Sequence, residues 1–342
     1  MKNKLCLIFS ILFLLFITDQ LTAQKKLSTS PTLFITNIQL IDGTGKPAYS
    51  ASVRIQGNKI LQVGSLKAMK NEQIMDGKGL VLAPGFIDSH SHHFADLEQH
   101  PQAIPTNSQG ITTIIIGQDG GSYKMDTLLK KFKEHSVAVN VATYTGQASL
   151  REEVMGEKDV YREASQAEID KMKILLQKEL DKGSLGLSTG LEYEQAFFSS
   201  KDEVLQLAKV AASAKARYMS HIRSEDIRLQ SAIDEIIEIG RQTKMPVQIS
   251  HIKIAQKDDW ETSAALIAKL EKARATGINI TVDESQRKAF KNTANNYTLS
   301  GLESRHGFKN TIKDNSSASM NLDEAHTFLS EIALLLIKIS VT

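Results

Sequence analysis

Residues 85–92 read GFIDSHSH, and this stretch joins the end of an apolar run to a pair of closely spaced histidines. The apolar run that ends at Ile87 predicts a short strand, and His90 and His92 follow it directly. Residues i and i+2 of an extended backbone point to the same side, so both imidazoles can reach one metal ion. Two surface histidines beside a turn are the simpler interpretation, so the pair needs support from its surroundings.

From residue 82 onward, short apolar runs rich in β-branched residues alternate with segments of helical period. This alternation predicts βαβ units and a parallel sheet. The helices carry end signals, since Ser200 with Glu203 predicts a capping box and Gly183 predicts a C-terminal cap. With the run at Ile87 the strands number seven, which is awkward for an eight-stranded barrel and possible for an open sheet. The other runs cover residues 110–116, 137–143, 185–188, 217–221, 247–251 and 278–282.

Two segments precede this pattern. Residues 1–23 have a basic start, an almost unbroken apolar run and small or tolerated residues at the end, and this predicts an export signal cleaved after Ala23. A buried helix or an uncleaved anchor is the alternative, although the apolar run is short of the about 20 residues that span a bilayer. Residues 32–81 alternate apolar and polar side chains, which predicts a small module of short antiparallel strands.

The bulk composition restricts the partners of the protein. A chain of 342 residues with 41% hydrophobic and 23% charged residues suits a globular fold with a sizeable core. A formal net charge of +2 gives no reason to expect a nucleic acid partner. The only cysteine, Cys6, lies in the predicted export signal. The exported form, periplasmic or secreted, would therefore have no thiolate ligand and no stable membrane span.

Three further residues follow predicted strands. His221 and His251 close two of the apolar runs, and Asp119 follows the run at residues 110–116. A lone histidine in such a place is more often a core group, and a lone aspartate is more often a turn residue. The carboxyl ends of parallel strands meet at one edge, however, so these three should join His90 and His92 in a metal site.

The ordered set of motifs around these residues resembles the D-aminoacylase (N-acyl-D-amino-acid deacylase) branch of the amidohydrolase superfamily, over roughly residues 33–283. The resemblance implies a TIM-like (β/α) barrel, here incomplete because no eighth strand is recognised, with a small β-sandwich module. It also implies a zinc site of one or two ions. The motifs are GFIDSHSH (85–92), GITT (110–113), LSTGLEY (187–193), HIRSE (221–225) and SHIK (250–253).

The same resemblance implies roles for individual residues. His90 and His92 would bind one metal position, and His221 and His251 would bind the other. Asp119 stands where many relatives place a bridging cysteine, so a harder carboxylate ligand would bridge the two positions.

A second group of residues would bind the substrate, a small N-acyl amino acid. Arg223 and Lys253 are candidates for holding its carboxylate, and Tyr193 is a candidate for shaping the acyl pocket. Each of the three could equally be a salt-bridge or packing residue.

The tail, residues 284–342, departs from the family pattern and has no assigned role. Relatives supply a catalytic aspartate from an eighth strand, whereas Asp314 and Asp323 lie in polar or helical surroundings. The catalytic acid is therefore unassigned, and the chain is interpreted as truncated or divergent at its C-terminal end. Three functions follow: zinc-dependent hydrolysis of N-acyl-D-amino acids or D-configured dipeptides, an inactive remnant that binds metal or ligand, or another amidohydrolase chemistry on cyclic amides.

Overall fold

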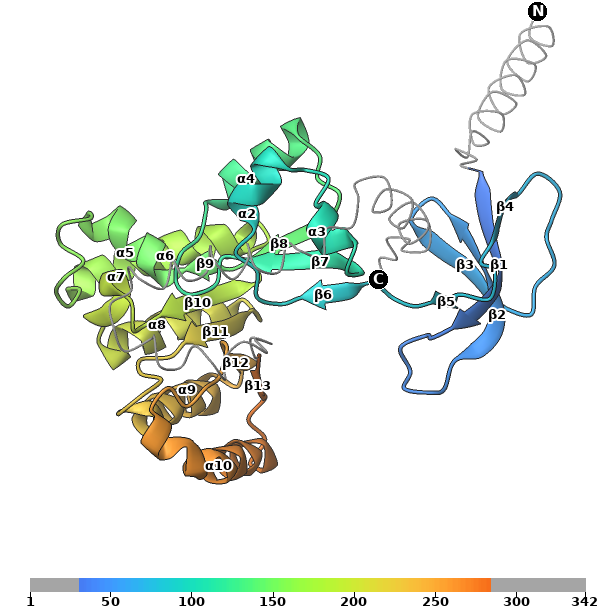
Figure 1. Cartoon of the computed structure of the whole chain (residues 1–342). Coiled ribbons are helices and arrows are strands. Elements are labelled where there is room, and N and C mark those ends of the chain that lie inside the picture. Colours follow the sequence, from blue (N-terminus) through green and yellow to red (C-terminus); the bar gives the residue numbers. More distant parts are fainter. Residues whose placement is uncertain (1–30, 284–342) are drawn as a thin grey trace, which may run out of the picture. The chain divides into compact units, whose positions relative to one another are not determined.

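The computed structural model describes residues 31–283, and their contacts divide them into two compact units, residues 31–84 and 85–283. The predicted export signal and the tail that begins at residue 284 lie outside the described residues. Within the described part, no helix is both long enough and apolar enough to cross a membrane. Each unit is built from its own strands (Figure 1).

The smaller unit is one five-stranded sheet. Its first three strands are antiparallel, as the alternating pattern predicts, whereas β4 and β5 pair with β1 in parallel. Because Leu82 belongs to β5, this unit extends to Pro84, three residues past the predicted boundary at residue 81. The strands are β1 (Thr32–Leu40), β2 (Tyr49–Gln56), β3 (Lys59–Gly64), β4 (Gln73–Asp76) and β5 (Val81–Leu82).

The larger unit contains parallel strands that follow one another in chain order. One sheet has the order β6-β7-β8 and the other has the order β13-β12-β11-β10-β9. Only Tyr144 separates β8 from β9, so a single stretch of chain connects the two sheets. The strands are β6 (Phe86–Asp88), β7 (Ile111–Ile116), β8 (Asn140–Thr143), β9 (Thr145–Gly146), β10 (Gly186–Gly190), β11 (Arg217–His221), β12 (Val247–Ile249) and β13 (Ile280–Val282).

Seven of these eight strands agree with the predicted runs, with small differences at the ends, whereas the two-residue strand β9 matches none of them. The run at residues 247–251 is shorter as a strand, because the backbone of His251 turns to a positive φ of 34°. Within residues 85–283, no hydrogen-bonded pairing joins β6 to β13, so a closed barrel is not confirmed. The ends of β6 and β13 nevertheless approach one another, since Nδ1 of His90, after β6, lies 3.2 Å from Oδ1 of Asp283, after β13.

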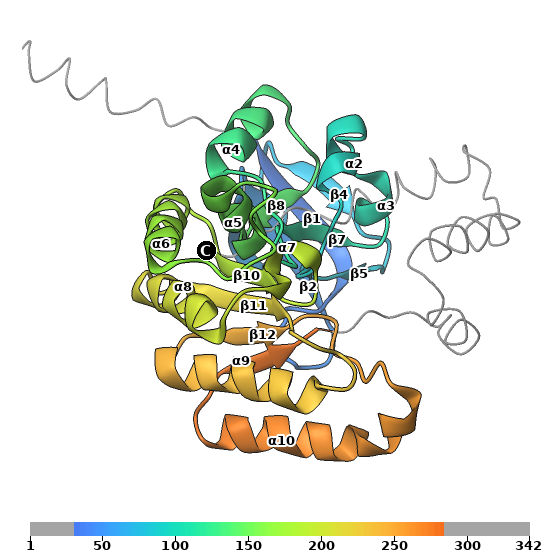
Figure 2. The same ribbon diagram turned by 90° about the vertical axis from the view of Figure 1, so that its left-hand side faces the viewer.

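Helices pack against these strands in sequence. Figure 2 shows α8, α9 and α10 beside strands β10 to β13, and each contacts the strands nearest to it in the chain. Apolar side chains of α6, α8 and α9, among them Met172, Leu207 and Ile233, form the main core with Leu187 and Val247 of the strands. The helices are α2 (Phe94–Gln99), α3 (Ile104–Asn107), α4 (Met125–Glu134), α5 (Gln147–Met155), α6 (Gln166–Asp181), α7 (Glu194–Phe197), α8 (Lys201–Ser213), α9 (Leu229–Thr243) and α10 (Ser263–Ala275), with a 3-10 helix at Lys257–Thr262.

The predicted capping box of α8 forms only in part. Ser200 Oγ accepts a hydrogen bond from the backbone N–H of Glu203, as expected for an N-cap. The Glu203 side chain does not return to the cap, because it is buried in an ion pair with Arg151. A complete capping box occurs instead at α6, between Ser165 and Glu168.

Candidate metal centre

The five predicted metal ligands lie at the carboxyl ends of the strands of the larger unit. His90 and His92 follow β6, and Asp119 follows β7. His221 is the last residue of β11, and His251 comes two residues after β12. The parallel strand order therefore carries side chains that are far apart in the sequence to one edge of the unit.

The side chains form two pairs of histidines that share one carboxylate. His90 Nε2 lies 3.1 Å from His92 Nε2, and these nitrogens lie 3.4 and 3.3 Å from Asp119 Oδ2. His221 Nδ1 lies 3.0 Å from His251 Nε2, which is 3.6 Å from Asp119 Oδ1. One oxygen of Asp119 thus faces each pair.

This arrangement fits a metal ion. Asp119 Oδ1 is buried and has no hydrogen-bond partner among the described residues, which is costly for a carboxylate oxygen unless a cation is bound. The ligand atoms of each pair of histidines, taken together with Asp119, lie within 4.8 Å of one another. Imidazole nitrogens and a carboxylate oxygen are donors that suit zinc.

The electrostatics of the site also favour positive charge. Burial lowers the pKa of His90, but Asp119 and Asp283 outweigh burial, so the pKa rises from 6.5 to about 9. The pKa of His251 is raised in the same way. Burial lowers it, but Asp119 and Glu225 outweigh burial and raise it to about 9. Burial raises the pKa of Asp119, but the nearby imidazoles of His251, His90 and His92 outweigh burial and hold it far below its usual range. Both histidine shifts have the same origin, because the buried carboxylates around these imidazoles favour positive charge in the site.

The backbone holds Asp119 in an unusual conformation. Its φ is 57°, a left-handed value that aspartate adopts more readily than most residues. Gly120, also at a positive φ, packs so closely that an added Cβ would lie 2.8 Å from the backbone nitrogen of Gly190. The tight packing of this loop against the end of β10 restricts the backbone that carries the Asp119 carboxylate.

Three carboxylates that sequence reasoning did not assign surround the histidines. Glu192 lies 2.9 Å from His221, Glu225 lies 2.8 Å from His251, and Asp283 contacts His90. The signal that could have identified them is their position, because each follows a strand at the same edge as the histidines. Asp283 is the first residue after β13, which corresponds to the seventh predicted run.

The predicted substrate-binding residues have different surroundings. Arg223 donates two hydrogen bonds of 2.9 Å to Glu235 and one to the backbone carbonyl of Ser199, so much of its guanidinium is engaged. Lys253 donates to Glu225 and lies next to His251. A role of either cation in binding a substrate carboxylate stays a prediction, and it requires a change of partner.

Tyr193 is the most accessible of the three predicted substrate-binding residues. Its ring packs against His221 with 4.4 Å between the ring centroids, and part of the side chain is exposed. Burial, helped by the nearby Asp119 and Glu225, raises the pKa of Tyr193 above its usual range. The phenol therefore stays neutral beside the histidines, where it can contact a substrate. Its acyl-pocket role stays a prediction.

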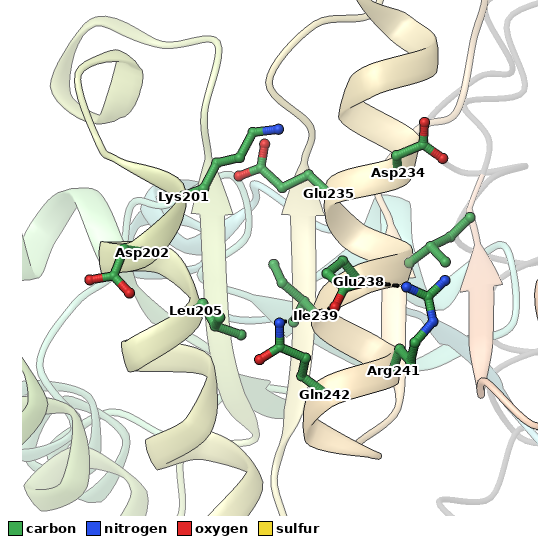
Figure 3. A pocket seen from close by; sticks show the side chains of 10 residues that line it. Lys201, Asp202, Leu205, Asp234, Glu235, Glu238, Ile239, Arg241 and Gln242 are labelled. Atoms are coloured by element: carbon green, nitrogen blue, oxygen red, sulfur yellow. Dashed lines mark hydrogen bonds and ion pairs between the residues drawn. The ribbon is translucent and has the colours of Figure 1, made fainter.

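A separate groove of about 600 Å³ lies between α8 and α9 (Figure 3). Its walls carry mostly charged and polar side chains, including the ion pair of Glu238 with Arg241. None of the five predicted metal ligands lines it. The groove is therefore distinct from the candidate metal centre.

Comparison with known proteins gives a family match and curated relatives at about 30% identity. A model of the amidohydrolase family matches residues 73–295. The N-acyl-D-glutamate deacylase of Alcaligenes xylosoxydans xylosoxydans is 32% identical over 267 residues, 71% of this chain and 54% of that protein. The D-aminoacylase of the same organism is 30% identical over 260 residues, 69% of this chain and 53% of that protein.

Solved structures agree with this result. The N-acyl-D-glutamate deacylase of Bordetella bronchiseptica, complexed with zinc and a phosphonate inhibitor, is similar with a TM-score of 0.70 and 30% identity. That likeness covers 75% of this chain and 58% of the other. The chain spans about half the length of the curated relatives it matches. The family match includes every described strand of the larger unit and all five predicted ligands, and the chain belongs to the amidohydrolase family.

Proposed function

We propose that the protein is a zinc-dependent hydrolase that cleaves the amide bond of N-acyl-D-amino acids or D-configured dipeptides. Water is added across the bond, and the products are a carboxylate and a free D-amino acid. The observation that carries the proposal is the sharing of Asp119 by two histidine pairs at one edge of an amidohydrolase fold. The relatives named above, which act on N-acyl-D-amino acids, support the substrate class.

His90, His92, His221 and His251 would hold one or two zinc ions, with Asp119 between them. A solved D-aminoacylase with a binuclear metal centre supports a site of this kind. Zinc would polarise the amide carbonyl and lower the pKa of water to about 7, which makes a nucleophile available at neutral pH.

The remaining chemistry depends on the side chains of the protein. The ring of Tyr193 beside His221 would contact the acyl group, and Lys253 would attract the substrate carboxylate. Cleavage also needs an acid that protonates the leaving amine. The described carboxylates near the histidines are engaged with them, and Asp314 and Asp323 lie outside the described residues, so this step has no assigned residue.

Amine release from matched N-acetyl-D- and N-acetyl-L-amino acids tests the proposal. The full chain is assayed with added zinc and after removal of metal. Zinc-dependent release from the D-substrates alone is the expected result. A folded protein that binds zinc but releases no amine would contradict hydrolysis and favour the inactive alternative. If the protein hydrolysed cyclic amides and none of the N-acetyl amino acids, the substrate class would be cyclic amides instead.

Substitution of the predicted ligands tests the metal site separately from the activity. Replacing His221 or His251 by alanine is expected to abolish zinc retention, since both belong to the more buried pair. His135, which follows α4 and is not one of the clustered residues, provides a matched histidine substitution. Stoichiometric zinc in His221→Ala would refute the site.

A further inference from the structure

We propose that Glu192, Glu225 and Asp283 are positioning residues for the metal centre. Each accepts a hydrogen bond from the outer ring nitrogen of one histidine, so that the opposite nitrogen keeps its lone pair toward the centre. The inference rests on the proposed zinc site and extends it to residues that are not ligands themselves. A neutral imidazole has one donor and one acceptor nitrogen, so fixing the donor fixes the acceptor.

Asp283 positions His90. Its Oδ1 lies 3.2 Å from His90 Nδ1, while His90 Nε2 faces His92 and Asp119. The carboxylate is itself held, because the backbone N–H of His251 donates to Oδ1 at 2.6 Å and Gln248 Nε2 donates to Oδ2 at 2.7 Å. Asp283 therefore presents a fixed acceptor to the outer nitrogen of His90.

Glu192 positions His221, with the roles of the two ring nitrogens exchanged relative to His90. Its Oε2 lies 2.9 Å from His221 Nε2, and His221 Nδ1 faces His251. The ring of Tyr193 packs against the same imidazole and limits its rotation. The inner nitrogen of His221 is therefore Nδ1, whereas the inner nitrogen of His90 is Nε2.

Glu225 positions His251. Its Oε1 lies 2.8 Å from His251 Nδ1, and His251 Nε2 faces His221 and Asp119. Lys253 Nζ also lies 2.9 Å from Nδ1, but it donates to Glu225 and lies 3.2 Å from the backbone carbonyl of His251. Because the Lys253 ammonium can donate to the Glu225 carboxylate and to the backbone carbonyl of His251, it does not need Nδ1 as an acceptor. The Nδ1–H of His251 can therefore donate to Glu225.

His92 differs from the other three histidines in its exposure and in having, among the described residues, no carboxylate at its outer ring nitrogen. Its side chain is 63% exposed, and within residues 31–283 only its Nε2 has a recorded polar contact. The side chains of His90, His221 and His251 are 12%, 7% and 18% exposed. The carboxylates thus accompany the buried imidazoles, whose orientation water cannot adjust, and such outer partners fix the tautomer of a metal-binding histidine.

The test compares zinc affinity, measured by chelator competition, in full-length variants. Replacing Glu192 or Glu225 by methionine, or Asp283 by leucine, removes the acceptor at similar size. Each change is expected to weaken zinc binding by about 10- to 100-fold. Glutamine or asparagine keeps an acceptor oxygen without the charge and should give a smaller loss. The control variants Glu194→Met and Asp226→Leu alter neighbouring exposed carboxylates that contact no described histidine, and they should bind zinc like the wild type.

A second measurement separates positioning from general stability. In the zinc-loaded protein with ¹⁵N-labelled histidine, NMR should find the ring proton on Nδ1 of His90 and His251 and on Nε2 of His221. Protons on the opposite nitrogens, or unchanged zinc affinity in all three acceptor-free variants, would overturn the inference. A crystal structure with any of the three carboxylates bound directly to zinc would do the same. If the wild type itself bound no zinc, the proposed function would fail instead.

Discussion

Replacing Glu203 with glutamine should destabilise the larger unit strongly. The side chains of Glu203 and Arg151 are both 0% exposed, and Arg151 Nη1 donates to Glu203 Oε2 at 2.5 Å. The other guanidinium donors bind backbone carbonyls: Nε binds that of Gln195 at 2.9 Å, and Nη2 binds those of Val160 at 2.8 Å and Arg162 at 2.6 Å. Arg151 therefore joins α5, α7 and the loop before α6, with Glu203 as its counter-ion.

The magnitude follows from the burial and the hydrogen bonds. Removing one partner of a buried pair leaves an uncompensated charge, which costs about 3–5 kcal/mol. Glu203 Oε1 also accepts from Gln147 Nε2 at 2.6 Å, so both of its oxygens are used. Glutamine has only one oxygen, and its NH₂ would face either Gln147 or Arg151, donor against donor. Glu203→Gln should fall in the upper part of this range.

The matched control is Glu238→Gln, the same change in a helix at an exposed ion pair with Arg241. These side chains are 45% and 56% exposed, so the change should cost less than about 1 kcal/mol. Urea denaturation of the metal-free full chain, followed by circular dichroism, gives both free energies of unfolding. If Glu203→Gln lay within about 1 kcal/mol of Glu238→Gln, the reasoning from burial would be refuted.

Three other outcomes are expected. Asp119→Asn, which tolerates the left-handed backbone, should lower zinc content at both histidine pairs, and unchanged zinc by atomic absorption would contradict a bridging carboxylate. The raised pKa values of about 9 for His90 and His251 stabilise the metal-free fold below pH 6.5, and this contribution should be lost as the pH rises through 9. Thermal unfolding at pH 6 and pH 10 measures it, and a double variant lacking both imidazoles should show a smaller difference. Exported protein should begin at Gln24, and N-terminal sequencing that found Met1 would exclude cleavage.

The sequence alone predicts the local elements and the residues that meet in the candidate metal centre. The alternation of apolar runs and helical segments predicts the parallel strands, because each pattern reports which face of one element is buried. The positions of His90, His92, Asp119, His221 and His251 after those runs predict their meeting, since the ends of parallel strands share an edge. These inferences need only short stretches of sequence and one rule of topology.

Tertiary packing sets which partners the charged side chains take. Asp283 reaches His90 across 193 positions of the chain, and Glu203 leaves its expected cap for Arg151, 52 positions away. Arg223, predicted to bind substrate, is engaged by Glu235. No local pattern encodes such choices, because a charged side chain selects its partner by distance and burial. Both are fixed only when the strands and helices have packed.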